Sequence, residues 1–461
     1  FPGRRPPLSF FRPEARPTEK AAIRLDYAPQ LVEDGFHLYR KGRAVCIAGG
    51  GSRGAMYGAY ELLRQLGCRW PLPGEEYEVV PKLEAFDWQG PELVSQPAMR
   101  RRGMAFILWQ WQPQVVEWVD YLAKNGFNFL FYMGIWQAPF AEAINERELG
   151  FEYGQHILRN LLPADLFEAH PEYFRFDGEK RNPDWNLCTS NDEALSVMGR
   201  NAQRMLGDLS VFDRLETLHT WADDLVGEGW CKCPECAGFS ETDQTVRMMN
   251  GIARHADLRD TKLGFCAYHA SIYAPEQARA AEAVRLMYAP RERCYLHPLG
   301  GCEANKRYLD YMRALVKAVP TEPEVFEYYN DCVLLRHMGM PLYPTIGKDV
   351  EVYMAEGMDG VMSLFFQDFS DWAYGINTYT LGKALWRGKG EAGDAMEFCA
   401  AVYGPAAPAI TAFFDRLFEL TATSMATCGY YDFVVLVFPT RDTWFGSHLA
   451  LLAPLSTPTT L

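Results

Sequence analysis

The stretch Arg101-Arg102-Gly103-Met104-Ala105-Phe106-Ile107-Leu108 opens a series of short apolar segments that alternate with amphipathic helical segments. Such alternation is typical of a parallel sheet whose strands are joined by helical crossovers. The predicted strands are 101–108, 127–132, one at an undefined position before 186–190, 217–222, 263–268, 285–288, 325–329 and 360–366. Eight strands over about 270 residues predict an α/β fold with a (β/α)8 barrel of the TIM type. A doubly wound open sheet is the alternative.

Outward from this region, the sequence changes character on both sides. The predicted units are a small α/β domain over residues 1–95, the barrel over residues 96–375 and a helical C-terminal region over residues 376–461. The small domain is predicted from short strands at 23–27, 36–40 and 44–48 and a helix at 55–66. The C-terminal region has amphipathic segments at 396–403 and 409–422, and we expect an irregular tail from residue 453.

A glycine-rich turn, Gly49-Gly50-Gly51-Ser52-Arg53-Gly54, joins the third strand of the small domain to its helix. Glycines at such a place let backbone N–H groups approach a phosphate at the helix N-terminus. The spacing fits the dinucleotide fingerprint only loosely, and neither Gly-Lys-Ser/Thr nor a second βαβ half follows. The turn therefore indicates close packing, with nucleotide binding as the weaker alternative.

Composition excludes several classes of protein. The 461 residues include 45 basic and 59 acidic side chains, giving a net charge of −14, whereas a nucleic-acid binder needs a basic face. Hydrophobic residues make up 48% and charged residues 23%, the balance of a globular protein. No apolar run reaches the roughly 18 to 20 residues of a membrane helix, and the first residues do not predict a signal peptide. The compartment and the oligomeric state stay open.

Acidic residues follow two of the predicted strands. Asp223 and Asp224 come after the fourth strand, and Glu327 lies in the seventh, on the opposite side of a barrel mouth. Glycosidic cleavage needs two carboxylates across a cleft, and adjacent acids can divide the roles of acid and base. We expect Glu327 and Asp224 to be the main catalytic pair, with Asp223 third. The alternatives are a cap for the two aspartates and a salt bridge inside the barrel for Glu327.

Other side chains at the predicted strand ends are candidates for substrate binding. Aromatic rings pack on the apolar faces of sugars, and polar groups bind hydroxyls. The aromatic candidates are Trp221, Trp230, Tyr268 and Tyr328, and the polar candidates are Asn191, His269, Arg291, His297 and Asp331. The alternatives are that each ring belongs to the barrel core and that Arg291 pairs with Glu292.

The segment Cys231-Lys232-Cys233-Pro234-Glu235-Cys236 is the most distinctive short motif. Cys231, Cys233 and Cys236 could bind a structural zinc ion with a fourth ligand from elsewhere, or two of them could form a disulfide. The second cysteine pair that normally completes such a zinc site is missing. We expect no catalytic cofactor, and any metal would brace the loop after the fourth strand.

Two parts of the chain resemble known glycoside hydrolases. Residues 47–63 and 66–70 resemble the small domain that precedes the barrel in β-hexosaminidases and α-glucuronidases, where the glycines serve packing. The barrel resembles glycoside hydrolase family 163, bacterial endo-β-N-acetylglucosaminidases that act on complex N-glycans. The stretches that carry this resemblance are 187–191, 221–224, 229–236, 243–244, 249–250, 267–269, 289–295 with His297, and 326–329 with Asp331.

The resemblance implies hydrolysis of a β-linkage after N-acetylglucosamine, in the chitobiose core of a glycan or glycoprotein substrate. In related hexosaminidases the 2-acetamido oxygen of the substrate attacks the anomeric carbon, and an Asp-Glu pair after the fourth strand orients that amide and donates the proton. Here the pair is Asp223-Asp224, one methylene shorter. The alternatives are an inverting, α-glucuronidase-like hydrolase that grips a uronic acid through Arg291 or Arg293, and a carbohydrate-binding barrel without catalysis.

Overall fold

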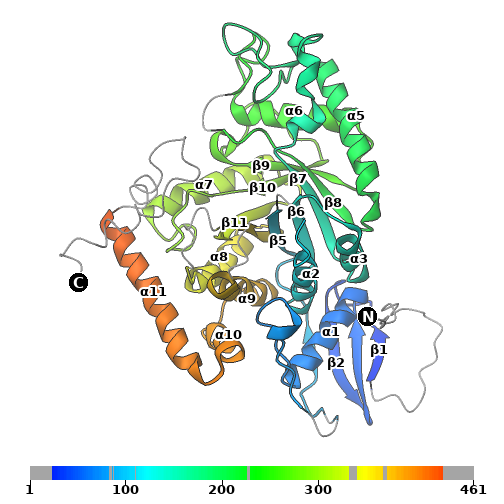
Figure 1. Ribbon diagram of the computed structural model, residues 1–461, viewed down its shortest axis with the longest axis vertical. Helices are drawn as coiled ribbons and strands as arrows, with labels where there is room; N and C mark the ends of the chain where they lie inside the picture. The colour runs from blue at the N-terminus through cyan, green and yellow to red at the C-terminus, as the bar shows by residue number, and fades with distance from the viewer. Residues whose placement is uncertain are drawn as a thin grey trace.

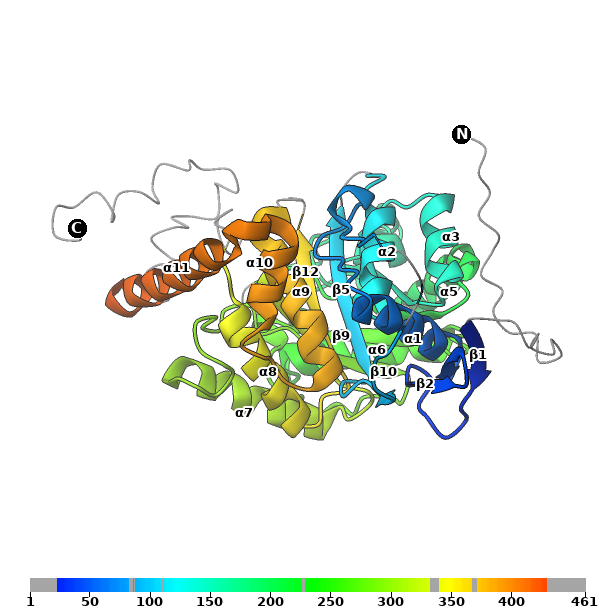
Figure 2. The same ribbon diagram turned by 90° about the horizontal axis from the view of Figure 1, so that it is seen from below.

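The computed structural model describes residues 23–82, 86, 88–108, 111–225, 229–331, 340–366 and 371–428 (Figure 1). The tail expected from residue 453 lies outside these residues, as do the first 22 residues of the predicted small domain. Within the described part, a barrel occupies the centre, with the N-terminal sheet on one side and the last helices on the other (Figure 2).

Eight parallel strands form a closed barrel, which confirms the predicted fold and rules out the open sheet. The strands are β5 (Arg101–Leu108), β6 (Phe129–Gly134), β7 (Gly150–Gln155), β8 (Leu215–Thr220), β9 (Lys262–Ala267), β10 (Val284–Tyr288), β11 (Glu324–Asn330) and β12 (Gly360–Phe366). They pair in chain order, and β12 closes the ring on β5 in register, Gly360 opposite Arg101. The third strand, whose place the sequence left undefined, is Gly150–Gln155.

Helices surround the barrel and connect its strands (Figure 1). They are α2 (Val115–Lys124), α3 (Ala138–Glu146), α4 (Leu158–Leu161), α5 (Asp192–Asp208), α6 (Glu241–His255), α7 (Glu303–Ala318), α8 (Tyr343–Ala355) and α9 (Asp371–Arg387). Local sequence explains several boundaries. A capping box at α6, for example, pairs the Ser240 hydroxyl with the Asp243 N–H and the Asp243 carboxylate with the Ser240 N–H.

The N-terminal unit is a four-stranded sheet in the order β1-β3-β2-β4, with one helix packed on it. Its elements are β1 (Ile23–Tyr27), β2 (Phe36–Lys41), β3 (Ala44–Gly49), α1 (Ser52–Gln65) and β4 (Leu93–Ser95). A Cβ atom on Gly50 would lie 1.9 Å from the carbonyl oxygen of Val32, and one on Gly54 would lie 2.2 Å from that of Gly35. The glycine-rich turn is therefore required for close packing against the preceding loop.

The chain continues after the barrel with α10 (Asp394–Tyr403) and α11 (Ala407–Cys428). Phe398 and Cys399 of α10 pack against Ile376 and Tyr379 of α9, which joins these helices to the barrel wall. Among the described helices, none is both long enough and apolar enough to cross a membrane.

A buried carboxylate joins the N-terminal unit to the base of the barrel. Asp34 accepts hydrogen bonds from Arg53 (2.7 Å), Arg102 (2.8 Å) and Asn128 (2.8 Å), and only 5% of its surface is exposed. Burial alone would raise the pKa of Asp34, but the two guanidinium groups outweigh burial and lower it from 3.8 to about 2. The ionised form of Asp34 therefore stabilises the fold.

This pKa shift predicts a specific acid sensitivity. Because the pKa is lower in the folded state, the stabilisation is present above about pH 4 and is lost as the pH falls towards 2, in total about 2 kcal/mol. In the wild type, the free energy of unfolding in urea should decrease as the pH is lowered from 5 to 2. Asp34→Asn should remove the part of this decrease that comes from protonation of Asp34. The exposed Asp310→Asn serves as the control. An unchanged slope in Asp34→Asn would contradict the assignment.

A second ion network fills the base of the barrel. Arg101 of β5 donates to Glu152 of β7, Glu324 of β11 and the partly exposed Glu216, and Glu152 also accepts from Arg285 of β10 (3.0 Å). These charged side chains come from strands on different sides of the barrel and contact one another, so the side chains must point into the barrel interior. Glu152 also accepts from His219 Nε2 (2.9 Å), which links the network upwards towards the barrel mouth.

Candidate active site

Inward-pointing residues lead from the base of the barrel to a small pocket at the carboxyl ends of β8 and β9. Thr217 and His219 point inwards in β8, and Trp221 continues this alternation just beyond the strand. The Trp221 indole donates to His219 Nδ1 (3.1 Å), so His219 bridges Trp221 and the buried Glu152. The residues that line the pocket include His156, Trp221, Asp223, Trp230, Cys266 and Tyr268.

Asp223 is the carboxylate of this pocket. Its backbone N–H donates to the Asn186 side chain (2.9 Å), and the carbonyl of the preceding Ala222 lies 2.5 Å from His156 Nδ1. Burial raises the pKa of Asp223 above its usual value and Asp224 adds to the rise, while Arg159 and His156 oppose it. A carboxyl group whose protonated form is favoured in this way is suited to donate a proton.

Asp224 lies beside Asp223 but is more exposed, and it belongs to a second group of charges. The His269 ring lies between two carboxylates, with Nε2 3.5 Å from Asp224 and Nδ1 3.2 Å from Glu292. Burial lowers the pKa of His269, although Glu292 and Asp224 oppose the shift. His269 has a φ of 47°, and such strained backbone conformations cluster at functional sites.

Arg291 and Asp331 form a third group at the ends of β10 and β11. The guanidinium of Arg291 lies 3.4 Å from the Asp331 carboxylate and 5.8 Å from the centre of the Tyr328 ring. Its charge also acts to lower the pKa of Tyr268, so the three groups adjoin one another. Because Asp331 and Tyr328 are almost fully buried, they hold Arg291 in place.

The aromatic candidates differ in how free they are to meet a ligand. Trp221 makes edge-on contacts with Phe131, His156 and Phe326, and so belongs largely to the barrel core. Trp230 is different, because its buried indole Nε1 has no hydrogen-bond partner among the described residues although the ring lines the pocket. Such a buried donor needs a partner, and a substrate oxygen would supply one.

Glu327 does not face the barrel mouth, which corrects its predicted place in the main catalytic pair with Asp224. In β11 the side chains of Phe326 and Tyr328 point inwards, so Glu327 between them points outwards, towards α8. There it accepts a hydrogen bond from Tyr353 and lies 3.0 Å from Arg293 Nη2, with no exposed surface. Glu327 is thus a buried salt-bridge partner, behind the barrel wall rather than inside it.

Two other predicted binding residues have structural contacts away from the pocket. The side-chain oxygen of Asn191 accepts from the Ala194 N–H (2.9 Å) and caps the N-terminus of α5. His297 lies with Cys294 and Cys302, and the ligand atoms of these three lie within 4.8 Å of one another. Neither residue has a described contact to Asp223, Asp224 or their partners.

The sequence profile of a protein family, the domain of unknown function DUF4838, matches residues 72–415. The chain belongs to the DUF4838 family. No curated protein matches this DUF4838 chain in sequence. The matched segment contains the whole barrel and every residue of the pocket.

Several solved structures share the fold of this DUF4838 chain at low sequence identity. A family 89 glycoside hydrolase from Clostridium perfringens in complex with PUGNAc has a TM-score of 0.54 and 11% identity, over 86% of this chain and 50% of that one. The GH20 exo-β-N-acetylglucosaminidase from Vibrio harveyi in complex with N-acetylglucosamine has a TM-score of 0.51 and 12% identity, over 87% of this chain and 70% of that one. A GH115 4-O-methyl-α-glucuronidase with specificity for decorated arabinogalactans has a TM-score of 0.52 and 13% identity, over 84% of this chain and 53% of that one.

These similarities show a shared barrel fold. The DUF4838 chain spans only about half the length of the family 89 and GH115 proteins. A shared barrel does not determine chemistry, which depends on the residues of this chain's own site.

Sequence reasoning missed several residues that surround Asp223. His156 and Arg159 follow β7, the strand whose position was undefined, and Asn186 lies in the long connection to α5. Locating the buried segment Gly150–Gln155 would have placed His156 at a strand end. Asn186 gave no local signal, because only the folded chain brings it to the Asp223 backbone.

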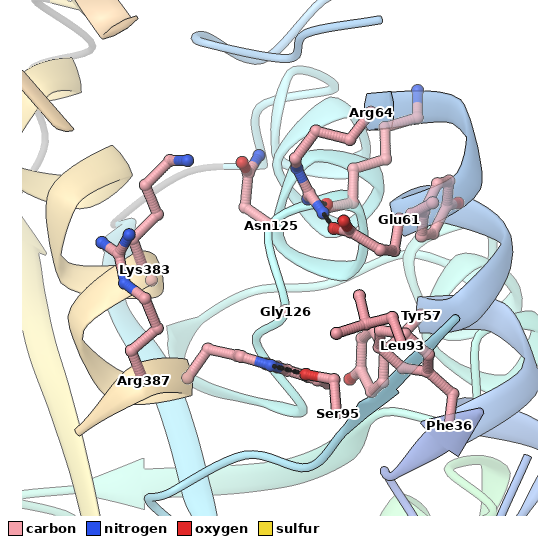
Figure 3. A pocket seen from close by; sticks show the side chains of 14 residues that line it. Phe36, Tyr57, Glu61, Arg64, Leu93, Ser95, Asn125, Gly126, Lys383 and Arg387 are labelled. Carbon is pink, nitrogen blue, oxygen red and sulfur yellow. Dashed lines mark hydrogen bonds and ion pairs between the residues drawn. The ribbon is translucent and has the colours of Figure 1, made fainter. Parts of the chain in front are cut away.

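The DUF4838 chain also has a wider crevice at the opposite, amino-terminal end of the barrel strands, between α1 and α9 (Figure 3). Lys383 and Arg387 of α9 form one side, and Glu61 and Arg64 of α1 form the other. Glu61 accepts from Arg64 (2.9 Å), and no second carboxylate lines the crevice among the described residues. We therefore place the chemistry at the carboxyl ends, where barrel enzymes hold their active sites.

Proposed function

We propose that this protein is a glycoside hydrolase that cleaves a β-linkage after N-acetylglucosamine, in the chitobiose core of complex N-glycans. The observation that carries the proposal is the adjacent pair Asp223 and Asp224 at the barrel mouth, one lining an aromatic pocket with a raised pKa and the other exposed beside His269. Paired carboxylates of unlike environment are what glycosidic cleavage requires. The resemblance to family 163 supports the substrate, and the hexosaminidase neighbour agrees with it.

In the proposed mechanism the two aspartates have different roles. Asp223 donates its proton to the leaving glycosidic oxygen, since its raised pKa keeps the carboxyl protonated to higher pH. Asp224, with His269 and Glu292 behind it, orients the 2-acetamido group so that its oxygen attacks the anomeric carbon. The indole N–H of Trp230, which has no partner within the described part of the chain, and the Tyr268 ring position the sugar in the pocket.

A uronic acid substrate is the second candidate, because Arg291 lies beside the pocket residue Tyr268. Arg293, the other arginine considered, has no exposed surface and is bound to Glu327 and Asp349. Arg291 is itself paired with Asp331, so binding of a carboxylate would compete with this pair. The N-acetylglucosamine substrate is therefore favoured.

A panel of three substrates tests the proposal. The protein is incubated with a glycopeptide carrying a complex N-glycan, an aryl β-N-acetylglucosaminide and an aldobiouronic acid, and the released sugars are separated by chromatography. Release of an oligosaccharide ending in one N-acetylglucosamine supports the proposal. Turnover of the aldobiouronic acid alone would favour the glucuronidase, and glycan binding without turnover would favour a non-catalytic barrel.

The charges around Asp223 predict a shift of the pH profile in one variant. Arg159 acts to lower the pKa of Asp223, so Arg159→Met should raise this pKa further. Because the acid must be protonated to act, the alkaline limb of kcat/KM should move to higher pH. The exposed Arg204→Met, on α5, should leave the profile unchanged. A limb that stays in place or moves to lower pH would contradict the role of Asp223.

A further inference from the structure

Four cysteines come together beside the barrel mouth, although they are far apart in sequence. Cys188 precedes α5, and Cys231, Cys233 and Cys236 lie in the loop between β8 and α6. Their four Sγ atoms all lie within 4.8 Å of one another, and all four side chains are buried. We propose that these cysteines bind one zinc ion, with Cys188 as the fourth ligand that the local motif lacks.

The distances fit a single tetrahedral ion. Zinc–sulfur bonds of about 2.3 Å place the sulfur atoms of a tetrahedron about 3.8 Å apart, and Cys188 Sγ lies 3.7 Å from Cys233 Sγ. A disulfide would require about 2.05 Å, so these two sulfurs are not bonded. Four thiolates in a tetrahedron are a preferred ligand set for zinc.

The surroundings of the sulfurs are those of thiolates. The Phe176 backbone N–H donates to Cys231 Sγ (3.4 Å), and the Ser190 hydroxyl lies 3.3 Å from both Cys188 Sγ and Cys236 Sγ. The Thr189 hydroxyl lies 3.6 Å from Cys236 Sγ, and the Arg181 guanidinium lies 4.0 Å from Cys231 Sγ. A Zn²⁺ ion with four thiolates carries a net charge of −2, which these donors and the arginine stabilise.

The backbone turns tightly around the proposed ion. The carbonyl of Cys233 accepts from the N–H groups of both Cys236 (2.9 Å) and Ala237 (2.8 Å), so the last two ligands are held on one turn. Cys231 is fixed separately, because its N–H and its carbonyl both bond to the side chain of Gln244 on α6 (3.2 Å each). The ligands are thus positioned by backbone contacts that do not depend on the metal alone.

The proposed ion would link two loops that carry the candidate active site. Cys188 lies two residues after Asn186, whose side chain holds the Asp223 N–H, and Cys231 directly follows the pocket residue Trp230. Zinc would therefore fix both Asp223 and Trp230 while remaining outside the pocket. This positioning role rests on the proposed function, whereas zinc binding itself does not.

Metal content and X-ray absorption of the purified full chain test the binding. We expect one zinc per chain, with four sulfur neighbours at about 2.3 Å. Cys188→Ala should lower the zinc content by at least fivefold, while Cys399→Ala, at a buried cysteine of α10, should keep one zinc. Chain that carries no zinc and takes none up from solution, or nitrogen and oxygen neighbours in place of sulfur, would overturn the proposal. The absorption spectrum of the wild type decides the matter even where Cys188→Ala fails to fold.

Hydrogen exchange tests the positioning role without measuring activity. After zinc is removed with a thiol reagent and a chelator, backbone exchange should rise at least tenfold in residues 176–191, 221–225 and 229–239 and stay constant in β5 and β6. Unchanged exchange in both loops would show that the metal does not fix them, even if it binds. If the zinc-loaded and the zinc-free protein are both folded and neither hydrolyses the glycan, the proposed function is wrong. The proposal that the four cysteines bind zinc would still hold.

Discussion

Asp223→Asn is expected to lower kcat/KM for glycan cleavage by about 10³-fold, because the amide cannot donate the proton that the leaving oxygen needs. The substitution keeps the shape of the side chain, and the backbone contact to Asn186 does not involve the carboxylate. An aryl glycoside with a good leaving group should be affected much less, since it needs little protonation. The comparison of the two substrates by steady-state kinetics is therefore specific for the role of an acid.

Glu327→Gln is the matched comparison. Glu327 is fully buried outside the pocket, and burial raises its pKa although Arg293 opposes the rise, so glutamine removes the charge while keeping an oxygen that can accept from Tyr353 or Arg293. We expect this variant to keep kcat/KM within about tenfold of the wild type. If folded Glu327→Gln loses as much activity as Asp223→Asn, the assignment of the acid is wrong and the outward orientation of Glu327 is not that of the working enzyme.

Arg101→Met is expected to have the largest effect on stability, a loss of about 3–5 kcal/mol, which is a large fraction of the roughly 5–15 kcal/mol that holds a typical domain folded. Arg101 is 5% exposed and donates to three carboxylates, of which Glu152 and Glu324 have no exposed surface. Removal of Arg101 would leave buried negative charge that is only partly compensated. Among the described contacts, Arg285 would be the remaining arginine paired with Glu152. Denaturant unfolding monitored by tryptophan fluorescence measures the loss.

The neighbouring arginine provides the control for this experiment. Arg100 is 54% exposed in its side chain and pairs with Glu322 and Asp359 at the surface. Exposed pairs contribute little, so Arg100→Met should cost less than about 1 kcal/mol. Equal effects of the two substitutions would show that the buried network does not hold the base of the barrel together.

Seven of the eight strands were predictable, the clearest being the nearly continuous apolar segments β6 and β12, as expected for strands buried on both faces, although β8 and β11 also carry polar residues. The exception, β7, contains two glycines and the buried Glu152, so its sequence does not look like a strand. Glu152 is tolerated because Arg101, Arg285 and His219 reach it from other strands. Such pairing over long sequence distances has no signal in a local pattern.

The candidate site was predictable in part for the same reason. The places of Asp223, Asp224 and the aromatic residues near strand ends could be predicted from the sequence, but the orientation of Glu327 could not. All seven residues of β11 are buried, so no alternation of polar and apolar residues indicates which of its side chains face inwards. The fourth cysteine could not be identified either, because Cys188 lies 45 residues before Cys233 and belongs to a different loop.

The most direct test of the central claim is the intact mass of a glycoprotein with complex N-glycans after incubation with this protein. We expect that each occupied site keeps a single N-acetylglucosamine, that Asp223→Asn leaves the glycans intact, and that Glu327→Gln still removes them. Unchanged glycan mass after incubation with the folded wild-type protein, together with no turnover of an aryl β-N-acetylglucosaminide, would contradict the proposed activity.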